Sequence, residues 1–130
     1  MSTLFAKIVS GEIPSYKIFE DTHTFAFLDI RPINLGHTLI VPKIETDYFV
    51  DVPEPYYTAV FHVAKKIAPA IQGASLCKRV GAVIAGLEVP HFHLHLIPLF
   101  RIEDIDFKKA KERSVEEMRE IHSKILKLLI

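Results

Sequence analysis

Three histidines alternate with bulky apolar residues in residues 90–100, the run PHFHLHLIPLF. Side chains two positions apart in a β-strand lie on the same face, about 6.6 Å from each other. Steps of two in a helix instead rotate by about 200° and scatter the side chains. The alternation therefore predicts a strand with His91, His93 and His95 on one face and the apolar side chains on the other. Three titratable rings on one face predict a site for an anion, a metal or nucleophilic chemistry.

Periodicity and turn residues predict the remaining elements. Helices are expected over residues 4–9, 54–73 and 114–129, and strands over residues 16–20, 24–28, 38–43, 79–84 and 90–100. Pro69 should kink the second helix or end it early, whereas Ser114 and Glu117 form a capping box for the last one. The short connection at residues 85–88 predicts an antiparallel hairpin. The chain should form a single α+β domain with a five-stranded, mainly antiparallel sheet, a central helix and a C-terminal helix.

Composition argues against several functional classes. The 130 residues include 49% hydrophobic residues and carry a formal net charge of zero, so long-range attraction to nucleic acid or to a membrane surface is not expected. Cys77 is the single cysteine, which rules out an internal disulfide and a cysteine-based metal knuckle. The N-terminus does not read as a secretory signal, and no apolar run approaches the roughly 18 residues of a membrane span. We therefore expect a cytoplasmic protein.

Three interpretations of the histidine run are open. The histidines could simply alternate on a half-exposed strand, although this is an uncommon pattern for three residues. Two of them could bind zinc, which would call for a further ligand and an orienting second layer. The interpretation we favour is phosphoryl or nucleotidyl transfer, since neutral imidazole is a competent nucleophile and a good leaving group once phosphorylated. Neighbouring imidazolium groups would offset the charge on phosphate oxygens.

The sequence resembles the histidine triad (HIT) family, whose signature alternates three histidines with apolar residues. Residues 91–97, HFHLHLI, meet this signature, and residues 36–43 carry the family's Gly-His-Thr-Leu-apolar-apolar-Pro-Lys segment. The resemblance extends through residues 14–43 and the opening segment 4–14, and covers roughly residues 3–100. Residues 101–130 carry no recognised motif and are expected to form a C-terminal helical extension.

This resemblance implies a homodimer whose two sheets join into one of ten strands, and hydrolysis or transfer at the α-phosphate of a nucleotide. His93 would attack phosphorus to form a nucleotidyl-histidine, which water then hydrolyses. His95 would contact phosphate and assist the leaving group. His91, with His37 behind it, would orient the ring of His93. No cofactor is implied.

The resemblance also implies a nucleotide pocket. Asp29 would accept hydrogen bonds from the ribose hydroxyls, although a turn role for it competes evenly. The base would lie between Phe5, Ile8, Phe27 and Ile30, several of which could equally be core residues. The loop before the histidines, which includes Gly86 and Glu88, would approach the phosphate.

Three departures from the family pattern matter here. Thr3 and Ala6 stand where some relatives carry a zinc-binding Cys-x-x-Cys, so we expect no structural zinc and no other metal. Glu88 replaces a Ser or Thr hydroxyl, and a carboxylate beside phosphate repels it unless it is protonated or turned away. The histidine that often follows the Pro-Lys pair is Glu45.

Two functions follow as hypotheses. The first is a nucleotide hydrolase or nucleotidyl transferase, an enzyme acting on adenosine phosphoramidates, dinucleoside polyphosphates or similar purine nucleotide conjugates. The alternative is a nucleotide-binding sensor or scaffold with little turnover. Glu88 favours it, as does the loop before the histidines, which looks shorter than in the family. A metal-dependent hydrolase is a third possibility.

Overall fold

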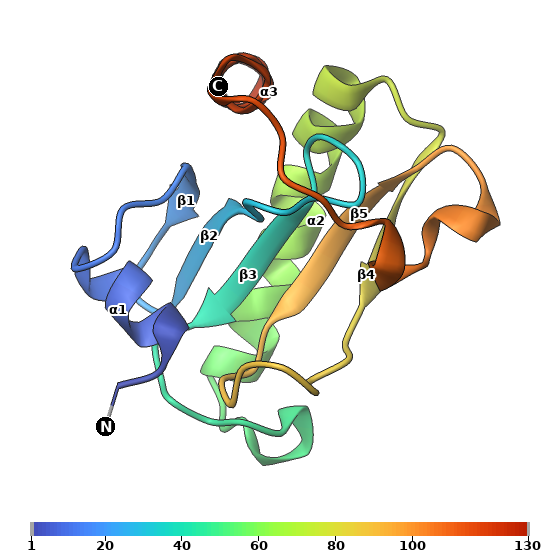
Figure 1. The fold of residues 1–130 in the computed structure, drawn as a ribbon. Helices are drawn as coiled ribbons and strands as arrows, with labels where there is room; N and C mark the ends of the chain where they lie inside the picture. The colour runs from blue at the N-terminus through green and yellow to red at the C-terminus, as the bar shows by residue number, and fades with distance from the viewer. Residues whose placement is uncertain (1, 130) are drawn as a thin grey trace.

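A computed structural model describes residues 2–129 (Figure 1). The five strands are β1 (Lys17–Glu20), β2 (Thr24–Leu28), β3 (Thr38–Pro42), β4 (Arg79–Val83) and β5 (Leu94–Leu99), and the α-helices are α1 (Leu4–Ser10), α2 (Tyr56–Ser75) and α3 (Val115–Leu128). All neighbouring strands pair antiparallel, in the order β1-β2-β3-β5-β4. The predicted α+β fold with a five-stranded antiparallel sheet is confirmed.

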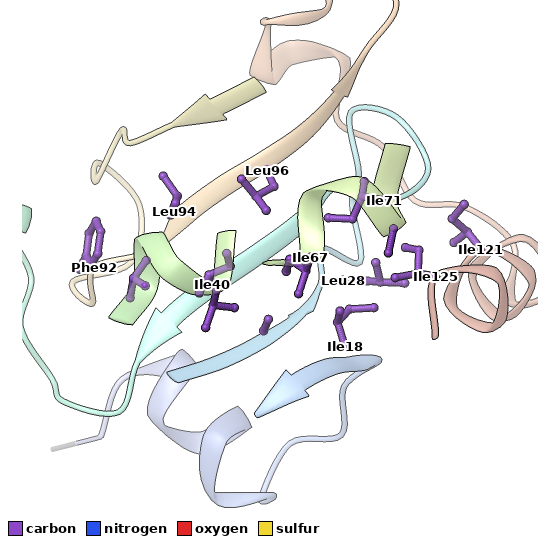
Figure 2. Packing of buried hydrophobic residues seen from close by; sticks show 14 of the residues in the cluster. Ile18, Leu28, Ile40, Ile67, Ile71, Phe92, Leu94, Leu96, Ile121 and Ile125 are labelled. Carbon is purple, nitrogen blue, oxygen red and sulfur yellow. The ribbon is translucent and has the colours of Figure 1, made fainter. Parts of the chain in front are cut away.

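The two faces of the sheet bury different residue sets, as the period-two alternation of strands requires. The face covered by α2 carries the larger core, whose members from the sheet include Ala26, Leu28, Ile40, Leu94 and Leu96. Figure 2 shows several of these side chains directed toward α2, with Ile121 and Ile125 of α3 beside them. The opposite face carries a smaller cluster beneath α1, made of Phe5, Phe25, Phe27, Leu39 and Val41. This second face is the one on which the predicted site lies.

The histidine run is only partly a strand. β5 begins at Leu94, so the prediction of a strand over the whole run is wrong for His91 and His93. The segment before β5 instead contacts the chain beyond β3, since the backbone N–H of Phe92 donates to the carbonyl oxygen of Thr46 at 2.6 Å. β4 and β5 do pair antiparallel, as expected, but through the longer connection of residues 84–93. Phe92 still packs in the larger core with Leu94, so the alternation of faces persists outside the strand.

Helix α2 continues through Pro69 to Ser75, so the prediction that this proline ends the helix early is wrong. Proline removes one backbone hydrogen bond, toward the carbonyl of Lys65 four residues earlier. Both Lys65 and Pro69 are exposed, so water can satisfy that carbonyl. Ile67 and Ile71 are fully buried on the other side of the helix, and their packing holds the last turns in place.

The segment that joins β5 to α3, residues 100–114, crosses back over the end of the sheet (Figure 1). The backbone N–H of Lys111 donates to the carbonyl oxygen of Pro32 at 3.3 Å, which fastens this segment to the loop between β2 and β3. The predicted capping box is confirmed at the start of α3, with Ser114 and Glu117 each bonding the other's backbone N–H. We call residues 100–114 the strap. No helix within residues 2–129 is both long enough and apolar enough to cross a membrane.

Candidate active site

Hydrogen bonds fix the protons of two of the histidines. The backbone N–H of Ile33 donates to Nδ1 of His37 at 3.1 Å, so the proton of a neutral His37 lies on Nε2. That nitrogen lies 2.9 Å from Nδ1 of His95 and donates to it. The proton of His95 is therefore on its own Nε2, the nitrogen that His37 leaves free. His37 and His95 are both buried and form a relay with one defined direction.

The register of the sheet explains why His37 reaches His95. β3 pairs with β5 so that Leu39 lies opposite His95, and His37 lies two residues before Leu39, immediately before β3 begins. The antiparallel direction places His37 beyond His95, away from His91. The expectation that His37 lies behind His91 is therefore wrong.

His93 has one nitrogen engaged and one available. Its Nδ1 lies 2.8 Å from the carbonyl oxygen of His91, and since a carbonyl only accepts, Nδ1 carries the proton. The lone pair of a neutral His93 is then on Nε2, and no group of residues 2–129 makes a hydrogen bond to that nitrogen. The ring also packs edge-on against Phe5, 4.8 Å between centroids, and against His95, 4.9 Å between centroids. His91 thus orients His93 through its backbone and not through its ring.

The ring of His91 is held between two elements. Its Nε2 donates to the carbonyl oxygen of Pro42 at 2.9 Å, and its Nδ1 accepts from the hydroxyl of Thr3 at 2.8 Å. Thr3 is the N-cap of α1, and its Oγ1 also accepts from the backbone N–H of Ala6. The sequence offered only one signal for this residue, a capping threonine before a short apolar helix. Thr3 links the helix that carries Phe5 to the histidine segment.

Burial keeps the histidines neutral. Burial first, and the neighbouring histidine rings second, lower the pKa of His37 to about 3 and that of His95 to about 4. Desolvation also lowers the pKa of His93 and of His91. A ring without a second proton keeps a lone pair, so His93 is poised to act as a nucleophile at neutral pH.

A cavity of about 300 Å³ opens beside His93 and His95; we call it the inner cavity. Its lining includes six of the seven residues predicted to contact a nucleotide, namely Phe5, Ile8, Phe27, Asp29, Ile30 and Glu88. Phe27, Leu39 and His95 form one row across β2, β3 and β5, which gives the cavity an apolar floor with a histidine at one end. Ile30 is 65% exposed and lies at the mouth. The seventh residue, Gly86, lines a separate cavity of about 240 Å³ with Phe92 and His93.

Asp29 lies where the apolar wall meets the histidines. Burial and the charge of Glu88 raise the pKa of Asp29, while a hydrogen bond from the backbone N–H of Arg31 lowers it. Its Oδ2 is 3.8 Å from Nε2 of His37. One ligand atom each of Asp29, His37 and His95 lie within 4.8 Å of one another, and His37 and His95 already bond each other in the relay. The absence of a metal stays a prediction.

A second cavity, of about 350 Å³, adjoins the first; we call it the outer cavity. It shares four lining residues with the inner cavity and is completed by three residues of the strap, Phe107, Lys108 and Ala110. The ring of Phe107 packs edge-on against His95 with 4.8 Å between centroids. Sequence reasoning missed the strap because residues 101–113 carry no motif, and its place depends on where the chain crosses the sheet.

Comparison with known proteins decides the family. The sequence model of the HIT domain matches residues 10–102. The chain belongs to the HIT domain family. A HIT-like protein of Borreliella burgdorferi is 36% identical over 132 residues, covering 94% of each chain. An adenosine 5'-monophosphoramidase of Saccharomyces cerevisiae is 40% identical over 97 residues, covering 73% of this chain and 61% of the yeast protein.

The fold of the HIT domain is shared with solved structures. The crystal structure of a Hit-like protein from Bartonella henselae, described as involved in cell-cycle regulation and determined with an unknown ligand, superposes with a TM-score of 0.84. It is 30% identical in sequence, and the match covers 97% of this chain and 95% of the other. This coverage extends over most of the strap and α3, and residues 103–128 lie beyond the matched HIT domain.

Proposed function

We propose that this protein is a nucleotide hydrolase or nucleotidyl transferase that acts at the α-phosphate of a purine nucleotide conjugate, such as an adenosine phosphoramidate or a dinucleoside polyphosphate. The observation that carries the proposal is the free Nε2 of His93 beside the inner cavity, with Nδ1 held by the carbonyl of His91. The 5'-monophosphoramidase activity named for the yeast relative supports the same reaction class.

In the proposed function, each part of the inner cavity has a role. The base lies against the apolar wall that Phe5, Ile8, Phe27 and Ile30 contribute, and the carboxylate of Asp29 accepts from the ribose hydroxyls. This places the α-phosphate at the end of the cavity where His93 and His95 meet. An aromatic and aliphatic wall with one carboxylate is the usual composition of a site that recognises a nucleoside.

In the first half-reaction, the lone pair on Nε2 of His93 attacks phosphorus, and the bond from phosphorus to the leaving group breaks. The electron pair of that bond stays with the departing nitrogen or oxygen. His95 stays neutral, because its Nδ1 accepts from His37, and its Nε2–H donates a hydrogen bond to the leaving atom, which takes its proton from water. His93 keeps its Nδ1 proton on the carbonyl of His91 and holds the nucleotidyl group on Nε2.

In the second half-reaction, water attacks phosphorus and releases a proton to the solvent. The bond from phosphorus to Nε2 breaks, its electron pair returns to His93, and the nucleoside monophosphate leaves. His95 keeps its Nε2 proton throughout the cycle. The relay from His37 fixes the ring of His95 with Nε2 toward the reacting groups, which is the orienting contribution expected of such a partner.

The test is turnover of a fluorogenic adenosine phosphoramidate. His93→Ala should abolish turnover while AMP binding, measured by calorimetry, persists. His62→Ala, on the exposed side of α2, is the matched histidine control and should retain the wild-type rate. Retained turnover in the His93 variant would defeat the covalent mechanism.

A nucleotide-binding sensor with little turnover is the second candidate, and Glu88 is the observation that favours it. This residue lines both cavities, where its charge repels a phosphate. The sensor function predicts tight AMP binding with negligible turnover across a panel of phosphoramidates and dinucleoside polyphosphates. Turnover by the wild-type protein would dismiss it.

A further inference from the structure

His95 lines both the inner and the outer cavity. The lining residues found only in the outer cavity all come from the strap. We propose that the outer cavity is the leaving-group subsite, and that Arg31 and Lys108 select leaving groups that carry an anion beyond the scissile bond. The inference rests on the proposed function, because it presumes that a nucleotide conjugate is cleaved between the two cavities. It adds two specificity-determining residues outside the histidine segment.

The position of the histidines places the leaving group. His93 lines the inner cavity but not the outer one, whereas His95 lines both. In a displacement at phosphorus, the attacking and leaving atoms lie roughly in line. With the nucleoside in the inner cavity and His93 attacking from there, the departing group lies on the side of His95. The outer cavity is the space available to it.

The strap is fastened in a way that shapes this space. Phe107 packs against His95 and offers an apolar surface beside the scissile bond. Arg31 donates from Nη2 to the carbonyl oxygen of Ala110 at 3.5 Å, which leaves the other guanidinium donors available to a ligand. The loop after β2 and the strap therefore form two walls of one cavity.

Lys108 is directed to the cavity while its neighbour serves the fold. The carboxylate of Asp106 accepts from the backbone N–H of Lys108 and fixes that turn. Lys109 lies 3.8 Å from a carboxylate oxygen of Asp104. Within residues 2–129, neither Arg31 nor Lys108 forms an ion pair with a carboxylate. The two cations of the outer cavity are thus available to a ligand.

Charge balance determines the sign of the preferred group. The outer cavity is lined by two carboxylates, Asp29 and Glu88, and two cations, Arg31 and Lys108. In the proposed function Asp29 keeps its charge but faces the nucleoside, where it accepts from the ribose hydroxyls, and Glu88 is the carboxylate that remains beside the two cations on the leaving-group side. An anion on the leaving group gains from both of them, while a neutral group gains only the contact with Phe107.

The experiment compares AMP amides that differ only in the far end of the leaving amine. The neutral substrate is the amide of n-butylamine, the carboxylate substrate is the amide of γ-aminobutyrate, and the phosphonate substrate is the amide of aminopropylphosphonate. The wild-type protein should show a higher kcat/KM for both anionic substrates. Lys108→Gln should lower the anionic-to-neutral ratio by about twofold to fivefold, because contacts of exposed charges are weak, and adding Arg31→Gln should lower it further.

Lys109→Gln is the matched control, since it removes one positive charge from the same turn without facing the cavity. It should keep the wild-type ratio. A preference for the phosphonate alone would assign the subsite to phosphate-type anions, and an equal preference would assign it to anions in general. Equal turnover of all three substrates by the wild-type protein, or the same fall in Lys109→Gln, overturns the subsite and leaves the proposed function standing. No turnover of any substrate overturns both.

Discussion

The neutral His37–His95 relay should make the fold sensitive to mild acid. The unfolded chain binds protons on both histidines below about pH 6.5, whereas the folded protein holds the pKa of His37 at about 3 and that of His95 at about 4. Between these limits the unfolded state binds more protons, so stability falls as the pH falls. Above about pH 6.5 both states are neutral at these positions and the effect vanishes.

The size of the effect follows from the pKa difference. At about pH 5, the pH is roughly 1.5 units below the pKa of a histidine in the unfolded chain but still above the pKa of the folded ring. Proton binding therefore stabilises the unfolded state by about 2 kcal/mol per histidine, at about 1.4 kcal/mol per unit. The raised pKa of Asp29 acts in the opposite direction. Carboxyls with a lowered pKa, such as Asp104, change stability only below about pH 4.5. The histidines therefore determine the pH dependence of stability between about pH 5 and about pH 6.5.

The assay is urea unfolding at about pH 7 and about pH 5, with linear extrapolation to water. His37→Gln removes one titrating ring, while the pKa of His95 stays low because burial and His93 cause that shift. The variant should therefore lose about 2 kcal/mol less than the wild-type protein between the two pH values. His62→Gln, on the exposed side of α2, should behave like wild type. An identical acid loss in His37→Gln and wild type would refute the reasoning.

Four further predictions concern the surroundings of the site. Thr3→Val should lower the free energy of unfolding by about 2 kcal/mol, because the helix cap and the bond to His91 are lost, and it should also lower kcat. Thr3→Ser should restore both quantities. Equal unfolding curves and equal kcat for the two variants would argue against this. Gly36→Ala should destabilise the fold by more than about 1 kcal/mol, because φ is +103° and the new Cβ would lie 3.3 Å from Pro98. This loss of stability should exceed that of Gly11→Ala, where φ is +89° and nothing lies within 4 Å of the new Cβ. Glu88→Gln should raise kcat/KM for an AMP amide by up to about fivefold, as expected for removing a repulsive charge worth about 1 kcal/mol, and an unchanged rate would show that the carboxylate turns away. Sedimentation at micromolar concentration should show a homodimer joined along the exposed edge strand β4, and a monomer would contradict this.

Elements with local signals were predicted well from the sequence. The capping box of α3 depends on two residues three positions apart, and β2 and β3 follow from short apolar runs beside turn residues, so both can be predicted without the fold. The buried face of α2 is harder to predict. Helical spacing of the apolar residues predicts a buried stripe that includes Phe61, but Phe61 is 37% exposed, whereas Val63 and Ala70 are buried. The helix is apolar over much of its circumference, so which side faces the sheet depends on packing.

The roles of the histidines were less predictable than their presence. The sequence indicates a cluster, but the partner of His37 depends on the register of β3 against β5, and the partner of Thr3 on the way α1 docks. Both are contacts between residues far apart in the chain, at separations of 58 and 88 positions. No local pattern encodes such separations, so the prediction that paired His37 with His91 is wrong, while the catalytic roles of these residues stay predictions.

The four histidines differ in which proton each one holds, and the backbone decides this. Nδ1 of His93 donates to the carbonyl of His91, and Nε2 of His91 donates to the carbonyl of Pro42. Nδ1 of His37 accepts from the backbone N–H of Ile33. A carbonyl cannot donate and an N–H cannot accept, so the backbone sets the tautomers of His91, His93 and His37, and His37 in turn sets that of His95. One outcome is a free lone pair on His93, and another is a free N–H on His95. A nucleophile and a hydrogen-bond donor thus lie side by side, and replacing either ring should remove its own role and leave the proton position of the other ring unchanged.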